Sequence, residues 1–155
     1  MKHTLITVVA TFLLIQTGRA QYEFSNEKRV ECTPIKSQDI TGTCWSFSTS
    51  SFLESELIRM GKGNLDLSEM YIVRNIYQDK ARNYMLRQGS AAFSQGALAH
   101  DLIRMISIAG VMPESSYTGL VGADSVYNHE EMEAGLKGYL DGVRSQKKLS
   151  QTWPT

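Results

Sequence analysis

The sequence lacks an excess of charge of either sign. It has 16 basic and 16 acidic side chains among its 155 residues, so its formal net charge is zero. A nucleic-acid-binding protein needs an excess of lysine and arginine to displace counterions from phosphates, so this class of protein is disfavoured. Hydrophobic residues make up 42% and charged residues 21% of the chain, which argues against a disordered protein and predicts an ordinary globular one.

The sequence also lacks the usual motifs for bound groups. No cysteines and histidines have the spacing of zinc ligands, no glycine-rich phosphate loop is present, and no pair of carboxylates stands out. We therefore expect neither a metal nor a cofactor. After the first 20 residues no apolar run is long enough to cross a bilayer, so the mature chain is expected to be soluble.

The N-terminus is the one strongly apolar segment. A short basic stretch, Met1-Lys2-His3, precedes an apolar run from Leu5 to Ile15 that is too short to span a membrane. Gly18-Arg19-Ala20 then places small residues at both positions that a signal peptidase recognises. We expect residues 1–20 to be a cleaved signal peptide and the protein to be exported, either to a periplasm or into the medium. An uncleaved membrane anchor is the alternative.

The mature domain, residues 21–155, is predicted to be mostly helical, with few strands and with a loop over Gly89–Gln95. Apolar residues at helical spacing predict four helices: about Cys44–Met60, Asp66 or Ser68 to Met85, Ala97–Ala109 and Glu130–Lys148. The apolar positions on these helices are Trp45, Phe52, Leu53, Leu57 and Met60; Met70, Val73, Tyr77 and Ala81; Leu98, Leu102, Met105, Ile106 and Ala109; Met132, Leu136, Tyr139, Leu140 and Val143. Asp66 and Glu69 have the spacing of a capping box at the start of the second helix. In the first helix, the spacing of the apolar residues does not decide whether Glu54 is buried or at the surface.

Cys44 has the sequence context of a nucleophile. It lies at the predicted start of a helix, where unpaired N–H groups and a partial positive charge favour the thiolate. The N–H of Cys44 and the side-chain amide of Gln38 can donate hydrogen bonds to the oxyanion of a tetrahedral intermediate. Gly42 allows a tight turn close to a substrate, and Trp45 is expected to pack beneath the site. The segment therefore predicts acyl transfer to Cys44.

Cys44 has two alternative roles. It can be a buried structural cysteine, or it can form a disulfide with Cys32, since an exported protein can keep disulfides. Such a bridge would leave Cys44 without a free thiol and therefore unable to act as a nucleophile. Gln38, Gly42 and Trp45 at their spacings favour the nucleophile, and Cys32 is expected to remain a spare thiol.

These residues carry a resemblance to a known family. The run Thr33-Pro-Ile-Lys-Ser-Gln38, followed by Gly42-Thr43-Cys44-Trp45-Ser46-Phe47, resembles the nucleophile segment of papain-type cysteine peptidases. Thr41 stands where most papains have a second cysteine. This departure, together with Leu67-Ser-Glu-Met-Tyr71 and Phe93-Ser-Gln-Gly-Ala-Leu-Ala-His-Asp101, is similar to the bleomycin hydrolase/aminopeptidase C branch. The resemblance extends from about residue 30 to the end of the sequence.

The resemblance implies an α+β papain-like fold, of which this chain is mostly the helical N-terminal lobe. It implies a thiol peptidase that acts on peptide substrates through an acyl-enzyme on Cys44, with Gln38 as oxyanion donor. Gly96 matches the first of two glycines whose backbone holds the substrate, and Ala97 replaces the second. Relatives in this branch are cytosolic, assemble into hexameric rings and use their C-terminus to restrict cleavage to the peptide N-terminus. The resemblance therefore allows a homo-oligomer for the full-length protein. The predicted export signal differs from the cytosolic location of these relatives.

The histidine that such chemistry needs is not evident. In papain-like enzymes it lies about 130–150 residues after the cysteine, which from Cys44 falls beyond Thr155. His3 leaves with the signal peptide, His100 is expected on a polar helix face, and His129 is expected to be a capping or solvent residue. We therefore expect a truncated N-terminal portion that is inactive alone. The alternative is a degenerate product that only binds peptides or a partner chain.

Overall fold

The computed structural model describes residues 22, 24–25, 28–123, 125–146 and 150, so the predicted signal peptide lies outside the described residues. The last predicted helix, expected to reach Lys148, ends at Arg144, with Ser145 as its C-cap. Within these ranges the chain forms α2 (Cys44–Arg59), α3 (Glu69–Leu86), α4 (Ala99–Ala109), the 3-10 helix η1 (Glu114–Ser116) and α5 (Glu130–Arg144). Over the same ranges, β-pairing is limited to two isolated bridges, Ile40 with Asn128 and Leu67 with Pro113. The prediction of a mostly helical unit is confirmed.

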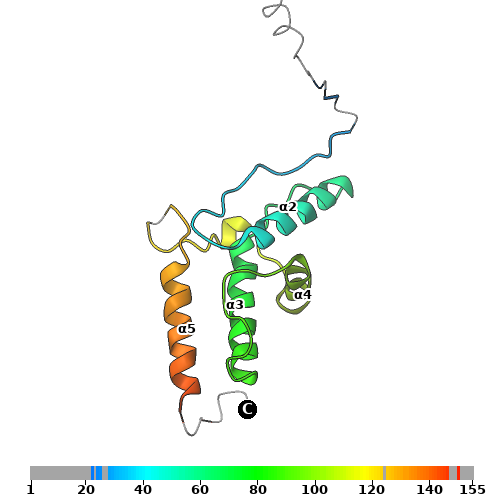
Figure 1. The fold of residues 1–155 in the computed structure, drawn as a ribbon. Helices are drawn as coiled ribbons and strands as arrows, with labels where there is room; N and C mark the ends of the chain where they lie inside the picture. The colour runs from blue at the N-terminus through cyan, green and yellow to red at the C-terminus, as the bar shows by residue number, and fades with distance from the viewer. Residues whose placement is uncertain (1–21, 23, 26–27, 124, 147–149, 151–155) are drawn as a thin grey trace, which may run out of the picture.

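Helix α3 is at the centre of the fold. It contacts α2, α4 and α5, and α5 lies alongside it (Figure 1). The predicted apolar stripe of this helix is confirmed, because Met70, Val73 and Tyr77 are buried and Ala81 is partly buried. Most of the core belongs to α3, which contributes Met70, Ile72, Val73, Ile76, Tyr77, Tyr84 and Met85.

Ser68, and not Asp66, caps the N-terminus of α3. The Ser68 hydroxyl accepts a hydrogen bond from the N–H of Tyr71 at 3.1 Å. The predicted capping box is wrong because both of its carboxylates are engaged by a lysine. Lys36 Nζ lies 2.7 Å from Asp66 Oδ1 and 2.6 Å from Glu69 Oε1.

Helix α2 packs through a largely polar face, which the sequence pattern did not predict. Phe52 and Met60, expected on its apolar face, are instead exposed, while Leu53 and Leu57 are partly buried. The fully buried residues of this helix are Trp45, Ser46, Thr49, Ser50 and Glu54.

Hydrogen bonds explain why α2 can bury these polar residues. Ser46 Oγ donates to the carbonyl of Glu69 at 3.1 Å, and Thr49 Oγ1 donates to the carbonyl of Trp45 at 2.7 Å. A buried hydroxyl with a partner avoids most of the cost of leaving water.

Helix α4 begins at Ala99, two residues later than predicted, because Asp101 Oδ2 accepts a hydrogen bond from the N–H of Leu98 at 3.1 Å and caps the helix there. Leu98 is consequently exposed. Leu102 and Met105 are buried as predicted. Gly110, with φ of 76°, follows the last turn and ends the helix.

Helix α5 packs less completely than its sequence pattern predicts. Leu140 is buried and Val143 partly buried, but Met132, Leu136 and Tyr139 are exposed. These three side chains line an apolar cavity of about 470 Å³ between α3 and α5. The pattern identified the correct face, but this face borders a cavity instead of a filled core.

Candidate active site

Cys44 is the first residue of α2, and its thiol is free and exposed. The N-cap residue Thr43 makes no side-chain hydrogen bond to the helix, because its hydroxyl lies 2.5 Å from that of Thr41. The first turn of α2 carries no acidic residue either. The N–H groups and the positive end of the helix dipole are therefore not neutralised by these side chains. Cys32 is likewise free and exposed, so the alternative Cys32–Cys44 bridge is not formed.

Gln38 is fixed in a tight turn ahead of Cys44. Its Nε2 donates to the carbonyl of Thr41 at 2.5 Å, and Thr41 Oγ1 donates back to the carbonyl of Gln38 at 2.7 Å. A carboxamide has two N–H hydrogens, and this turn uses one of them. Gln38 thus has one donor left for a substrate, in a side chain whose position is set by its own loop.

The segment that precedes α5 is hydrogen-bonded to this turn. Ile40 N–H donates to the carbonyl of Tyr127 at 3.0 Å, and His129 N–H donates to the carbonyl of Ile40 at 3.4 Å. Asp39, at a positive φ of 51°, accepts from the N–H of Tyr127 at 3.0 Å. Hydrogen bonds with Ser37 and with this N–H lower the pKa of Asp39.

The structure brings the flanks of Cys44 to the loop that contains Gly96. Gly42 N–H donates to Gln95 Oε1 at 2.6 Å, and the buried indole of Trp45 donates from Nε1 to the carbonyl of Gln95 at 3.0 Å. A Cβ built on Gly96 would have no atom within 4 Å. Gly96 thus borders open space beside the segment that bears the thiol.

Lys80 of α3 is hydrogen-bonded to the same loop. Its Nζ donates to the carbonyl of Ser94 at 2.6 Å and also to the carbonyl of Gly96. Burial lowers the pKa of Lys80, against the opposing effect of Asp101 and Glu133. Sequence reasoning missed both Lys80 and Gln95, since their partners on the loops lie up to 53 residues away in the chain and no local pattern marks them.

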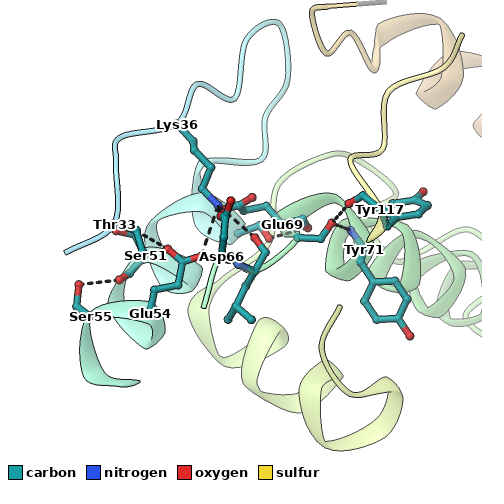
Figure 2. A network of polar contacts seen from close by, with 12 residues as sticks. Thr33, Lys36, Ser51, Glu54, Ser55, Asp66, Glu69, Tyr71 and Tyr117 are labelled. Carbon is teal, nitrogen blue, oxygen red and sulfur yellow. Dashed lines mark hydrogen bonds and ion pairs between the residues drawn. The ribbon is translucent and has the colours of Figure 1, made fainter. Parts of the chain in front are cut away.

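An ionic cluster with two buried carboxylates, Glu54 and Glu69, anchors the segment that leads to Gln38 (Figure 2). Glu54 of α2 has no exposed side-chain area. Its carboxylate accepts from Thr33 Oγ1 at 2.5 Å and from the N–H of Leu67 at 2.8 Å, and it lies 3.4 Å from Lys36 Nζ. The open question about Glu54 is answered by these contacts, which make it a fully buried acid.

Lys36 connects Glu54 to α3 through Asp66 and Glu69. Burial acts to lower the pKa of Lys36, but its hydrogen bonds to Asp66 and Glu69 outweigh that effect and raise the pKa above its ordinary value. Burial raises the pKa of Glu69, and the hydrogen bond from Lys36 opposes it. We call Thr33, Lys36, Glu54, Asp66 and Glu69 the Lys36 cluster.

The two histidines within the described residues differ in their surroundings. His100 is exposed, with Nε2 3.7 Å from Asp101 Oδ1, as predicted for a polar face. His129 occupies the N-cap position of α5 without a side-chain hydrogen bond to the helix. It is half-buried and lines the cavity between α3 and α5, with its ring centroid 6.0 Å from that of Tyr77. His129 thus has the predicted capping position, but its side chain does not cap the helix and is half-buried instead of in solvent; this burial lowers its pKa.

The cavity is separate from the thiol, because Cys44 is not among its lining residues. In the described ranges, no group of three or more His, Cys, Asp or Glu residues is placed to hold a metal ion. No helix within them combines the length and apolar character needed to cross a bilayer.

Comparison with known proteins identifies the family. A model of the papain family cysteine protease domain matches residues 20–152. Cysteine proteinase 2 of Dictyostelium discoideum is 28% identical over 129 residues, which cover 82% of this chain and 31% of that protein. The viral cathepsin of Autographa californica nuclear polyhedrosis virus is 28% identical over 101 residues, which cover 64% of this chain and 28% of the viral protein. The chain spans less than a third of the length of these curated relatives. Because the family model covers most of the sequence, the chain belongs to the papain family of cysteine proteases, and its helices correspond to the N-terminal lobe of that fold.

Proposed function

We propose that this chain supplies the nucleophile of a thiol peptidase, with Cys44 as the attacking residue. One observation carries the proposal. An exposed thiol lies at the uncapped N-terminus of α2, and the residues on both sides of it are hydrogen-bonded to the loop of Gly96. A helix N-terminus stabilises negative charge on sulfur, and the loop offers peptide backbone next to open space.

In the proposed reaction Cys44 Sγ attacks the carbonyl carbon of a peptide bond. The Cys44 N–H and the remaining amide hydrogen of Gln38 donate to the oxyanion. The C–N bond then breaks, the amine takes a proton and leaves, and water hydrolyses the thioester to regenerate the thiol. The peptide lies along Gly96, with Trp45 packed beneath the site.

The general base is proposed to come from outside this sequence. His100 is exposed on α4, and His129 lines the cavity between α3 and α5. Neither is hydrogen-bonded to Cys44 among the described contacts. A histidine, oriented by an asparagine or aspartate, is the partner that a cysteine nucleophile requires.

Two finer features of the protein are also proposals. Thr41 and the runs beginning at Leu67 and Phe93 support the bleomycin hydrolase/aminopeptidase C branch, and thus aminopeptidase activity of the full-length enzyme. Comparing turnover of peptides with free and acetylated N-termini tests this assignment. Export through a cleaved signal peptide rests on residues 1–20, and a mature N-terminus at Gln21 is the result expected from N-terminal sequencing.

An epoxide inhibitor directed at cysteine peptidases tests the central proposal. We expect stoichiometric labelling of Cys44 in the full-length enzyme, detected by mass spectrometry of the labelled peptide. Cys32→Ser should be labelled like the parent protein, and Cys44→Ser should not be labelled. Labelling of neither thiol, or of Cys32 alone, contradicts the proposal.

Peptide binding without turnover is the second candidate. Large apolar side chains are exposed on several helices, among them Phe52 on α2, Ile108 on α4 and Tyr139 on α5, and they provide surface for a peptide or a partner chain. Turnover of peptide substrates by the full-length gene product distinguishes the two candidates. Labelling of Cys44 with no turnover in that product favours the binding role.

A further inference from the structure

Gln95 connects the segment around Cys44 to the loop that contains Gly96. Its Oε1 accepts from the N–H of Gly42 at 2.6 Å, and its carbonyl accepts from Trp45 Nε1 at 3.0 Å. The two donors lie on either side of Cys44, one in the preceding turn and one in the first turn of α2. A single residue thereby contacts both flanks of the thiol.

The fit at this contact is tight. A Cβ on Gly42 would lie 3.1 Å from Cβ of Gln95, which is closer than almost all side-chain contacts. The neighbours of Gln95 are also fixed, because Lys80 donates to the carbonyls of Ser94 and Gly96. The neighbours of Gln95 are therefore bonded to α3 through Lys80, and Gln95 itself is bonded to the turn at Gly42.

We propose that Gln95 is a positioning residue, which acts through Gly42 to set the placement of the Cys44 thiol relative to a peptide bound along Gly96. The inference rests on the proposed peptidase function. Nucleophile and substrate loop belong to segments about 50 residues apart, as the Trp45–Gln95 bond shows. A short hydrogen bond between such segments gives them one shared geometry, and the productive approach of two reacting groups depends steeply on geometry.

A positioning role differs from a purely structural one in what it changes. The rate at which a small neutral haloacetamide alkylates Cys44 depends on the thiol and on access to it. The rate of a peptidyl epoxide depends in addition on how the bound peptide lies relative to the thiol. The ratio of the two rate constants therefore isolates positioning, and a general effect on the thiol cancels from it.

The experiment uses the full-length enzyme with Cys32→Ser, so that Cys44 is the one thiol left within residues 1–155. Gln95→Met has nearly the same shape but lacks the amide acceptor, and Gln95→Glu keeps an acceptor oxygen. We expect Gln95→Met to lower the ratio of peptidyl epoxide to haloacetamide rate constants roughly five- to tenfold, the factor that one hydrogen bond supplies. Gln95→Glu should restore most of it. Hydrogen exchange at the Gly42 N–H, followed by NMR, should be faster in Gln95→Met and slow again in Gln95→Glu.

Gly42→Ala tests the same contact from its other side and replaces Gln95→Met if that variant does not fold. Its added Cβ should force the loops apart and lower the ratio in the same way. An unchanged ratio in Gln95→Met, or in Gly42→Ala where that variant replaces it, overturns the inference. So does a parallel fall in both rate constants, which indicates a structural role alone. If the parent protein shows no preference for the peptidyl reagent, the proposed peptidase function itself fails, and the inference fails with it.

Discussion

The hydroxyl of Thr33 donates a 2.5 Å hydrogen bond to Oε2 of Glu54, whose side chain is completely buried. The other carboxylate oxygen accepts from the N–H of Leu67 at 2.8 Å. One acid therefore joins the segment that leads to Gln38, helix α2 and the turn before α3. This junction lies a few residues ahead of Gln38, so the proposed oxyanion donor depends on it for its position.

Glu54→Ala is expected to destabilise the protein strongly. Thr33 and Leu67 lose their acceptor, and Lys36 loses one of its negative partners inside the fold. We expect the free energy of unfolding to fall by about 3 kcal/mol, measured by urea denaturation. Glu56→Ala is the matched control, because Glu56 pairs with Arg59 near the surface of the same helix and such pairs contribute little. Similar losses in both variants would contradict the role of the Lys36 cluster.

Acidification is expected to destabilise the protein through His129. Burial lowers its pKa below the ordinary value of 6.5, against a smaller opposing effect of Glu133. The unfolded chain then binds a proton more readily than the folded one. Stability is therefore present above about pH 6.5 and is lost as pH falls through the folded pKa. We expect the thermal midpoint of the parent protein to fall more steeply on acidification than that of His129→Asn.

The control for this pH dependence is His100→Asn, at an exposed position on α4. It should follow the parent protein at every pH. Burial also raises the pKa values of Glu69 and Glu114, which acts in the opposite direction, but equally in all three proteins. A pH dependence that is the same for the parent protein and His129→Asn shows that His129 is not the responsible group.

Gly119→Ala is expected to be among the most destabilising glycine replacements. Gly119 has φ of 79°, and a Cβ there would overlap Cβ of Met70 and lie 2.9 Å from its Cγ. We expect a loss of about 2–4 kcal/mol in the free energy of unfolding, from the left-handed backbone and from the overlap together. Gly122→Ala also has a positive φ but open space around it, so its loss should be about 1 kcal/mol. Equal losses would show that Met70 moves away at no cost.

Gly96→Ala separates binding from stability. The added methyl group meets no atom within 4 Å, so the thermal midpoint should change little. Under the proposed function it obstructs the peptide backbone, and the peptidyl epoxide should label Cys44 more slowly while the haloacetamide rate stays the same. Gly138→Ala, on the exposed surface of α5, should leave both rates unchanged and gain about 1 kcal/mol from helix propensity. Undiminished peptidyl labelling of Gly96→Ala would remove Gly96 from the proposed site.

The sequence predicted the helices well where their apolar stripe is buried against other helices. Met70, Val73 and Tyr77 of α3 behave as their spacing indicates. Prediction failed for the buried face of α2, where Phe52 and Met60 are exposed, and it left the burial of Glu54 open. Apolar periodicity located this helix but not its buried face, because that face packs through hydrogen-bonded hydroxyls and a paired acid whose partners lie mostly on other segments.

The start of α3 is a second place where the local sequence pattern did not predict the contacts that form. The spacing of Asp66 and Glu69 fits a capping box, yet Lys36, 30 residues from Asp66, binds both carboxylates and leaves the cap to Ser68. An ionic partner so distant in the chain outweighs the local preference.

The order of the helices and the place of Cys44 at the head of one of them were determined by the sequence alone, since helix formation and its end signals act over a few neighbouring residues. Tertiary structure decided which atoms surround that cysteine. Gln95 reaches Gly42, and Glu54 reaches Thr33, only after the chain has folded back across 53 and 21 residues respectively. Contacts at such separations depend on how the helices pack, and no local pattern encodes that.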